Sequence, residues 1–519
     1  MHIYNATQGQ MGLHLPNALI VDNFAGGGGA SMGLEMAFKR PVDIAINHNA
    51  EAISMHQVNH PDTQHYCESV WDVDPLKATH GLPVEWAHFS PDCTHHSKAR
   101  GGKPKKKEIR GLAWIVIKWA ILKRPEKISL ENVEEFKTWG PLNTEGQPIK
   151  ERAGETFEAF ILMLTTGIKK THPAVKELRE FMPLGFDISP VFTGLGYNVD
   201  SKELRACDFG IPTTRKRFFM VARCDGQQVQ WPEPTHSKGL LPYKTAADCI
   251  DWSIPCRSIF NRPKPLAENT MARIAKGLRK FVLESNDPFI LEKNKYAFID
   301  RQFGTGGGNS VAEPLGTIMT QGNGKSALVV ATMAPFITEH ANASNQRNMR
   351  LDEPLRTICA GVKGGHFALV TAFLVKHYGG NYTGAGIDMR APLDTITTTD
   401  HHALVSAFLI KYYGNDKDGC DINQPLHTIT TNDRFGLVLV KINGETYQIT
   451  DIGMRMLAPH ELYKAQGFPD GYIHDRTADG KPLTKTAQVR MVGNSVPPGL
   501  IAAIAKANTK QQQKNRRAA

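Results

Sequence analysis

Residues 18–38 read ALIVDNFAGGGGASMGLEMAF, and this stretch decides the fold. The apolar run at 18–24 predicts a buried strand, and the glycines at 26–29 predict a tight turn. The segment that follows spaces its apolar residues for a helix. A strand, a glycine turn and a helix in that order predict the opening unit of an α/β domain.

The same alternation continues along the chain. Strands that alternate with helices predict a doubly wound α/β domain with a largely parallel sheet. Such sheets bind ligands at the carboxyl ends of their strands, and the motifs below follow such ends. Further strands are expected at 42–47, 84–90, 127–133 and 217–223, and helices at 50–58 and from 110 to 123.

Length and charge narrow the class of protein. A chain of 519 residues is too long for one compact core and predicts roughly two to four domains. Hydrophobic residues make up 41%, which is typical of a globular chain. The formal net charge of +10 favours a polyanionic partner, nucleic acid first, over a basic enzyme with an ordinary surface.

Apolar runs and cysteines bear on the compartment. The longest apolar run, 112–122, is interrupted by Lys118 and is too short to cross a bilayer. Residues 1–20 lack the pattern of a signal peptide. No two of the eight cysteines are closer than seven residues apart, so zinc spacing is absent. We therefore expect a cytoplasmic protein without a membrane or a metal.

Beyond residue 258 glycine, threonine and aromatic residues become more frequent, the helix pattern fades, and an internal repeat begins. Each copy is followed by a turn and an apolar run such as ALVV, which predicts β-hairpins; a purely structural array is the alternative. The helix pattern returns at 449, so we divide the chain into 1–258, 259–448, 449–508 and a basic tail, 509–519. The copies are EPLGTIMTQ (313–321), EPLRTICAG (353–361), APLDTITTT (391–399) and QPLHTITTN (424–432).

Cys93 lies at the end of an expected strand, in SPDCTHHS (90–97), and a basic loop follows it. Cationic neighbours lower the pKa of a thiol and favour the nucleophilic thiolate. A strand-end cysteine without such a loop is more often inert. We assign His95 and His96 to phosphate contact or loop packing, because no further metal ligand is near in the sequence.

Three more motifs carry functional groups. The loop with Phe24, Gly26 and Gly28 lets a backbone approach a ligand, although many glycine loops bind nothing. Glu131 ends a strand and is either a proton donor or a helix cap. Arg215 and Arg217 alternate on a strand and so share a face, which suits phosphate or a base oxygen; a solvated edge strand is the alternative.

In this order the motifs resemble those of the DNA (cytosine-5)-methyltransferase family. The resemblance covers residues 18–133, 195–223 and 453–506, and it looks like the prophage-borne branch. The family's variable target recognition domain falls where the repeats lie. The matching motifs are FAGGG (24–28), SPDCTHHS (90–97), ENV (131–133), RKR (215–217), RMLAPHELYKAQGFPD (455–470) and GNSVPP (493–498).

The sequence also departs from the family pattern. Asp92 and Thr94 replace the proline and glutamine that usually flank the catalytic cysteine. Asn47 stands in place of an acidic ribose contact, and Thr213 in place of a glutamine.

The resemblance implies an S-adenosyl-L-methionine-dependent methyltransferase domain with an inserted β-rich target recognition domain. It implies Cys93 as the nucleophile, assisted by Glu131, Arg215 and Arg217, on a cytosine flipped out of double-stranded DNA. We expect a monomer. The cofactor would be held by Phe24, Gly26, Gly28, Asn47, Asp72, Asn494 and Val496.

Two other functions remain open. A tRNA methyltransferase of the same fold usually has a small recognition segment, unlike the long repeat region here. A catalytically inactive DNA-binding protein, or a partner-binding module, would not need Cys93 and Glu131 together.

Overall fold

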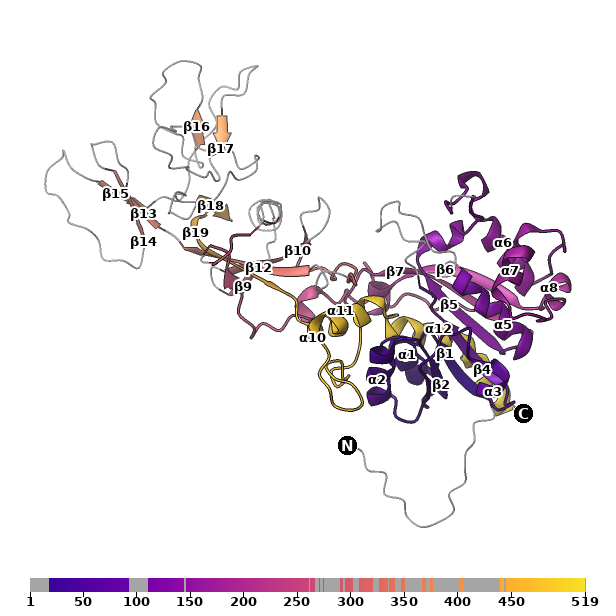
Figure 1. Cartoon of the computed structure of the whole chain (residues 1–519). Coiled ribbons are helices and arrows are strands. Elements are labelled where there is room, and N and C mark those ends of the chain that lie inside the picture. The colour runs from indigo at the N-terminus through magenta and orange to yellow at the C-terminus, as the bar shows by residue number, and fades with distance from the viewer. Residues whose placement is uncertain are drawn as a thin grey trace, which may run out of the picture. The chain divides into compact units, whose positions relative to one another are not determined.

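The structure is a computed structural model of the chain (Figure 1). Among the described residues no helix is both long and apolar enough to span a membrane. The structure describes residues 18–92, 111–143, 146–260, 262–266, 270, 274, 290–292, 295–301, 308–320, 326–334, 336–340, 347–350, 366–369, 374–376, 402–404, 439–442 and 445–518.

The chain divides into two compact units. Unit 1 contains residues 1–244 and 462–519, and unit 2 contains residues 245–461. The boundaries predicted from the sequence between the catalytic and recognition domains, 258/259 and 448/449, remain a proposal. The two compact units show how the chain packs and not which part performs which function.

Unit 1 is built on a seven-stranded sheet in the order β3-β2-β1-β4-β5-β7-β6. The strands β1 to β5 pair in parallel, whereas β7 runs antiparallel to both β5 and β6. The five strands predicted from the sequence are confirmed, and β3 and β6 were not predicted. The bounds are β1 Leu19–Asn23, β2 Ile44–Ile46, β3 Gln64–Tyr66, β4 Val84–Phe89, β5 Lys127–Asn132, β6 Asn198–Arg205 and β7 Lys216–Arg223.

Helices cover both faces of this sheet, as expected for a doubly wound α/β domain. The predicted helices at 50–58 and 110–123 are confirmed as α2 and as η2 with α5. The bounds are α1 Gly29–Phe38, α2 Ala50–Asn59, α3 Pro75–Ala78, η2 Gly111–Trp114, α5 Ile115–Leu122, η3 Glu134–Thr138, η4 Lys150–Arg152, α6 Glu155–Leu164, α7 Pro173–Phe181, α8 Pro190–Thr193, η5 Ala206–Phe209, α11 Lys485–Asn494 and α12 Pro498–Ala518.

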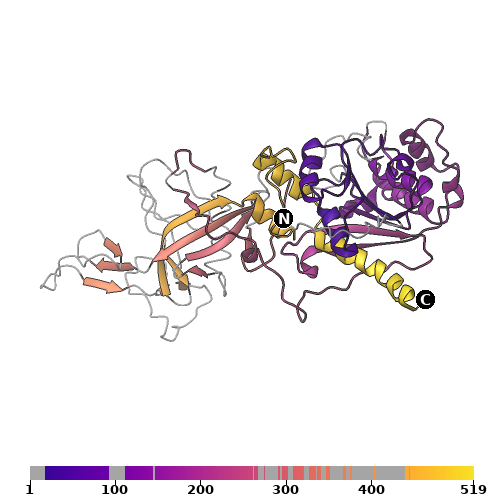
Figure 2. The ribbon, with the colours of Figure 1, turned by 90° about the horizontal axis from the view of Figure 1, so that it is seen from below.

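The C-terminal helix α12 packs against α1, although the two lie at opposite ends of the sequence (Figure 2). The contact is close at Gly33, where a Cβ atom would lie 2.2 Å from Ile501 Cγ2 and 2.4 Å from the Pro498 carbonyl oxygen. Ile501 and Leu500 also belong to the buried cluster on this face, together with Ile20 of β1. Helix α12 therefore packs together with α1 on the same face of the unit 1 sheet.

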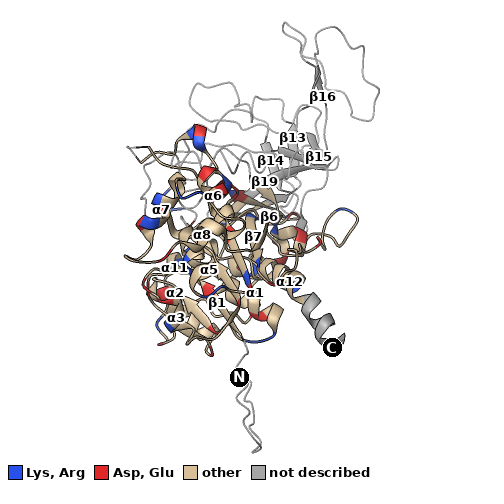
Figure 3. Ribbon diagram, turned by 90° about the vertical axis from the view of Figure 1, so that its right-hand side faces the viewer, with Lys and Arg blue, Asp and Glu red and all other residues tan. Residues whose placement is uncertain are grey.

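Charged residues of unit 1 are interspersed along the described ribbon (Figure 3). Many of them form ion pairs. Glu203, for example, contacts Lys137 at 2.9 Å and Lys216 at 2.5 Å. Because Lys137 and Lys216 are exposed, each of these two pairs stabilises the fold by at most about 1 kcal/mol.

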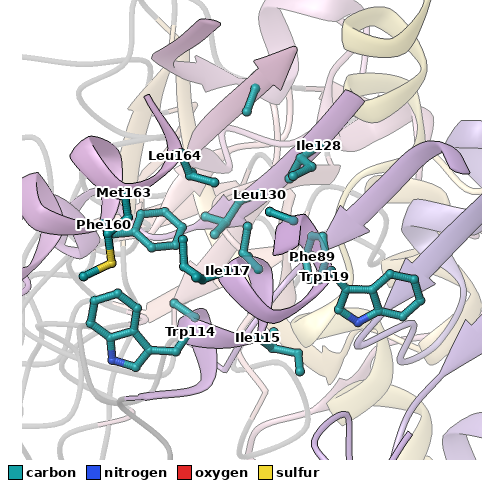
Figure 4. Close-up of a cluster of buried hydrophobic side chains, with 14 of the residues drawn as sticks. Phe89, Trp114, Ile115, Ile117, Trp119, Ile128, Leu130, Phe160, Met163 and Leu164 are labelled. Carbon is teal, nitrogen blue, oxygen red and sulfur yellow. The ribbon is translucent and has the colours of Figure 1, made fainter. Parts of the chain in front are cut away.

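The opposite face of the sheet carries the larger core (Figure 4). Trp114 of η2 packs with Phe160 of α6, whereas Trp119 of α5 packs with Phe89 of β4, and all four side chains are fully buried. Burial of a side chain of this size contributes about 2 kcal/mol. Because consecutive residues of a strand face opposite sides, Ile20 and Val21 of β1 enter different cores.

Unit 2 is β-rich, and its strands pair antiparallel. Its main sheet contains β8 Arg257–Ser258, β9 Ile290–Glu292, β10 Lys295–Arg301, β11 Asn309–Ser310, β12 Ser326–Ala334, β18 Leu439–Ile442 and β19 Glu445–Met456. The other described strands of this unit are β13 Phe336–His340, β14 Arg347–Arg350, β15 His366–Leu369, β16 Leu374–Lys376 and β17 His402–Leu404. The 3-10 helix η6 Ala246–Asp248 lies at its start, and α10 Pro459–Ala465 spans the boundary with unit 1.

The hairpin predicted for the first repeat is wrong. No strand lies within 313–320, and the following ALVV run is part of β12, which pairs with β10 and β19. The other three copies lie outside the described residues. Where flanking segments are described, β13 pairs with β15 and β16 with β17. A segment after one copy thus pairs with the apolar run of the next copy.

Candidate active site

The carboxyl edge of the unit 1 sheet gathers most of the predicted site residues. Phe24 follows β1, Asn47 follows β2 and Asp92 follows β4, while Glu131 lies at the end of β5. Because β7 runs in the opposite direction, its beginning lies at this same edge, and Arg217 joins the group. The sequence placed Phe24, Asn47 and Glu131 at the carboxyl ends of strands, and the parallel pairing of those strands brings them to one edge. The expectation that the arginine motif also follows the carboxyl end of a strand is wrong, because β7 runs antiparallel to β5.

The glycine loop between β1 and α1 has one open side and one packed side. Phe24 has φ +68° and Gly26 has φ +52°, so both lie in the left-handed region. Among the described residues, a Cβ atom at Gly26 would meet only the Phe24 carbonyl oxygen, at 3.6 Å, so a ligand can approach the backbone there. A Cβ atom at Gly28 would instead lie 2.2 Å from Tyr472 Oη.

The closing block of the sequence packs against the start of α1. A Cβ atom at Gly29 would lie 2.0 Å from Ser495 Oγ and 2.2 Å from the Val496 carbonyl oxygen. Val496 is buried, whereas Asn494, at the end of α11, is exposed. The structure thus brings the GNSVPP block beside the FAGGG loop.

Asn47 and Asp72, two of the residues predicted to contact the cofactor, interact with other parts of the protein in the structure. The side-chain oxygen of Asn47 accepts a hydrogen bond from the Asn49 amide at 2.8 Å, just before α2. Asp72 is exposed in the turn that precedes α3, where its charge acts on Lys118. Asn47 is therefore adjacent to the glycine loop at the sheet edge, while Asp72 belongs to the turn beyond β3.

Glu131 is only 6% exposed, and its Oε1 atom lies 3.1 Å from Arg217 Nε. Its neighbour Asn132 donates a hydrogen bond to the Pro91 carbonyl oxygen at 3.1 Å. This bond ties the end of β5 to the segment that leads into Cys93. Cys93 itself, with the basic loop up to residue 110, lies outside the described residues.

Arg215 differs from Arg217 in its surroundings. β7 begins at Lys216, so the expectation that both arginines alternate within the strand is wrong. Arg215 is 3% exposed, and its Nη1 atom donates to the Gly493 carbonyl oxygen at 2.9 Å. Gln466 contacts the same region through a 3.0 Å bond to the Val492 carbonyl oxygen. Both side chains hold the closing block in place.

A buried polar network that the sequence did not predict lies beneath the glycine loop. Asp22 is fully buried and accepts a hydrogen bond from Ser31 Oγ at 2.6 Å. Burial raises the pKa of the Asp22 carboxyl to about 7, although the bond from Ser31 opposes this shift. His56 Nε2 lies 2.9 Å from Ser31 Oγ, and His56 Nδ1 lies 2.8 Å from His65 Nε2.

This network holds its histidine in the neutral state. Burial lowers the pKa of His56 well below its usual range, and the neighbouring His60 and His65 lower it further. Ser31 and His56 are nine and thirty-four residues beyond Asp22, and neither belongs to a motif. Among the described residues, no group of three or more His, Cys, Asp or Glu side chains is arranged to hold a metal ion.

Known proteins similar to this chain include a protein family and individual methyltransferases. A family model described as C-5 cytosine-specific DNA methylase matches residues 19–145, 187–303 and 393–510. The type II methyltransferase M1.HphI of Haemophilus parahaemolyticus is 41% identical over 64 residues, which are 12% of this chain and 16% of that protein. The type II methyltransferase M.AgeI of Thalassovita gelatinovora is 24% identical over 225 residues, 42% of each chain.

These matches therefore span less than half the length of either relative. The solved structure of the S. pombe Dnmt2 methyltransferase is 13% identical and aligns over 95% of this chain and 99% of its own. Its TM-score is 0.42, which is too low to carry an argument. The family model covers most of unit 1 and parts of unit 2, and on that match the chain belongs to the C-5 cytosine-specific DNA methylase family.

Proposed function

We propose that this protein transfers a methyl group from S-adenosyl-L-methionine to carbon 5 of cytosine in double-stranded DNA, at a specific sequence. Family membership supports the reaction class. The observation that carries the proposal is the nearly buried Glu131–Arg217 pair, which lies at the same sheet edge as the glycine loop and Asp92. A carboxyl group, a cofactor loop and the entry to a cysteine loop are the parts this reaction needs.

The described residues fit the proposed cofactor. The open backbone at Gly26 admits a ligand, and the half-buried Phe24 ring offers an apolar surface beside it. The start of α1 follows this loop directly, and the positive end of a helix dipole favours a carboxylate such as that of the cofactor. Bound S-adenosyl-L-methionine supplies an electrophilic methyl group. We assign its binding to Phe24, Gly26, Gly28, Asn47, Asp72, Asn494 and Val496.

In the proposed reaction Cys93 makes carbon 5 nucleophilic. Carbon 5 of cytosine is a poor nucleophile, so the Cys93 thiolate first forms a bond to carbon 6. Glu131 protonates or hydrogen-bonds ring nitrogen 3, so the electron pair from the broken ring double bond is delocalised as an enamine. Carbon 5 then takes the methyl group. A base removes the carbon-5 proton, and the returning electron pair expels the Cys93 thiolate.

The two arginines have different parts in this proposal. Arg217 contacts Glu131 directly and orients its carboxyl group toward the base. Arg215 holds the closing block through Gly493 and thereby supports the cofactor side of the site. Because a stacked base cannot reach these groups, the target cytosine is flipped out of the duplex, and the loop at 94–108 closes over it.

A labelled-methyl assay tests the proposal. The purified protein is incubated with S-adenosyl-L-methionine labelled in its methyl group and with either duplex DNA or tRNA. We expect label in DNA, recovered as 5-methylcytosine after digestion to nucleosides. Label in tRNA alone would favour the RNA enzyme, and label in neither would favour an inactive binding protein.

A further inference from the structure

The phenol of Tyr472 contacts the backbone of the glycine loop from its packed side. Tyr472 Oη donates a hydrogen bond to the Gly27 carbonyl oxygen at 2.7 Å. The same oxygen atom lies 2.2 Å from where a Cβ atom on Gly28 would be. Tyr472 is 6% exposed, and Gly27 is buried. This contact therefore closes the inner side of a loop whose outer side is open at Gly26.

Several neighbours fix the position of Tyr472. Its ring lies 4.6 Å from the Phe468 ring, centroid to centroid. The next residue, Ile473, exchanges two hydrogen bonds with the Asn59 side chain of α2, at 2.7 and 2.9 Å. Because Asn59 and Ile473 bond in both directions, the backbone beside Tyr472 is fixed to α2.

A second chain of polar contacts reaches the phenol. His60 Nε2 lies 3.5 Å from Tyr472 Oη, and His60 Nδ1 lies 2.8 Å from Glu35 Oε1. Burial raises the pKa of the Tyr472 phenol well above its ordinary value, so the group keeps its proton and remains a donor near neutral pH. Glu35 and His60 thus lie beside the phenol, while the Gly27 carbonyl oxygen accepts its hydrogen.

The loop needs such support because its backbone is strained. Phe24 at φ +68° is a bulky residue in the left-handed region, which persists only when the surroundings impose it. Gly28, at φ +84°, lies directly before α1. A loop that must present its amides in one conformation binds more tightly when that conformation already exists in the free protein.

We infer that Tyr472 is a positioning residue for S-adenosyl-L-methionine, because it fixes the Gly27 carbonyl and with it the path of the cofactor loop. The inference rests on the proposed function. Tyr472 does not touch the reacting atoms in this scheme. It acts through the loop, so its loss should weaken cofactor binding without slowing methyl transfer once the cofactor is bound.

The test compares Tyr472→Phe with wild type by calorimetric titration of S-adenosyl-L-methionine into the protein. We expect Kd to rise about three- to tenfold, the usual effect of losing one hydrogen bond to a buried group. KM for the cofactor should rise by a similar factor, while kcat and the affinity for DNA stay within twofold. This split separates a positioning role from a general loss of structure.

The matched control is Tyr463→Phe. Tyr463 is also a buried tyrosine, and it stacks on Tyr472 with ring centroids 6.1 Å apart, but its hydroxyl faces Met55 Sδ at 3.6 Å. Its removal should leave cofactor affinity within twofold of wild type. If Tyr472→Phe fails to fold, Asn59→Ala removes both bonds to Ile473 and should raise Kd in the same direction.

Three results would overturn the inference. If Tyr472→Phe, or Asn59→Ala in its place, binds the cofactor with wild-type affinity, this contact does not position the cofactor loop. The proposed function would then still stand. An equal loss of affinity in Tyr463→Phe shows a general packing effect. A wild-type protein that binds no S-adenosyl-L-methionine overturns both the inference and the proposed function.

Discussion

The carboxyl group of Asp22 lies in β1, between β2 and β4, and is out of contact with solvent. A buried carboxyl resists ionisation, and burial is the main reason why the pKa of Asp22 is raised to about 7. An unfolded chain would restore the ordinary pKa of 3.8. Folding therefore favours the protonated carboxyl, and the stability that this group contributes is full below pH 3.8 and is lost as the pH rises through about 7.

Asp22→Asn should remove this dependence, because an amide does not ionise. The free energy of unfolding of wild type, relative to Asp22→Asn, should fall between pH 5 and pH 7 by up to about 1.4 kcal/mol per pH unit. Denaturant unfolding at several pH values measures it. Folding lowers the pKa of His56 in both proteins, so its contribution largely cancels in the difference. A difference that stays constant with pH would show that Asp22 is ionised in the folded protein.

At the residue scale the sequence predicted the groups at strand ends but not the contacts that hold them. The glycine loop and Glu131 carry local signals, namely four glycines after an apolar run and a carboxyl group at a strand end. The contact between Tyr472 and Gly27 joins residues 445 positions apart, and no local pattern encodes such a pair. The sequence prediction placed the Arg215 side chain on a face of the strand because it included Arg215 in the strand, whereas β7 begins one residue later, at Lys216.

At the scale of elements, the packing of α1 on α12 depends on the absence of a side chain at Gly33. In a helix, alanine is favoured over glycine by about 1 kcal/mol. Here a methyl group would meet the Pro498 carbonyl oxygen at 2.4 Å, and backbone cannot easily move away. The higher helix propensity of alanine would therefore stabilise the fold, whereas the clash with α12 would destabilise it, and the clash has the larger effect on the free energy of unfolding.

Gly33→Ala should accordingly destabilise the protein by about 1 to 3 kcal/mol, as overpacked sites do. Thermal unfolding of the variant measures the shift. Gly471→Ala is the control, because a Cβ atom at that exposed glycine would have no neighbour within 4 Å in the part of the chain that the structure describes. A Gly33→Ala protein as stable as wild type would mean that α12 does not pack against α1 as described.

The sequence predicted helices and strands correctly where the apolar pattern was long. It did not predict which strands pair with each other. The five predicted strands of unit 1 appear within a few residues of their expected bounds. The repeats in unit 2 suggested hairpins within each copy, since Thr-Ile-x-Thr and ALV runs both favour strands. The described pairs instead join segments from successive copies, because pairing is decided by neighbours in space.

At the scale of the whole molecule, we propose that chemistry and sequence recognition lie in different parts of the chain. The residues that we propose as catalytic belong to unit 1, and the repeat region belongs to unit 2. The repeat region, residues 300–440, contains lysine, tyrosine, asparagine and histidine, which are residue types that bind phosphates and base edges in other DNA-binding proteins. The net charge of +10 should make DNA binding weaken steeply as salt is raised.

Exchange of residues 300–440 for the corresponding segment of a relative tests this division. The chimaera should methylate the relative's DNA sequence, because the groups that act on the base remain unchanged. Bisulfite sequencing of DNA from cells that express each protein measures the methylated sites. If an active chimaera methylates the original sequence, the recognition role assigned to the repeats is wrong.

The central claim is that Cys93 attacks carbon 6 of the target cytosine, and mechanism-based trapping tests it most directly. A DNA duplex with 5-fluorocytosine at the target holds the covalent intermediate, because fluorine cannot leave as a cation. With wild-type protein and S-adenosyl-L-methionine, we predict a protein–DNA adduct that survives denaturing electrophoresis and whose linked peptide contains Cys93. Cys93→Ser should form no adduct, since a hydroxyl is far less ionised near neutral pH, while each of the other seven cysteines should be replaceable. An adduct at another cysteine, or methylation by Cys93→Ser at the wild-type rate, would contradict the mechanism.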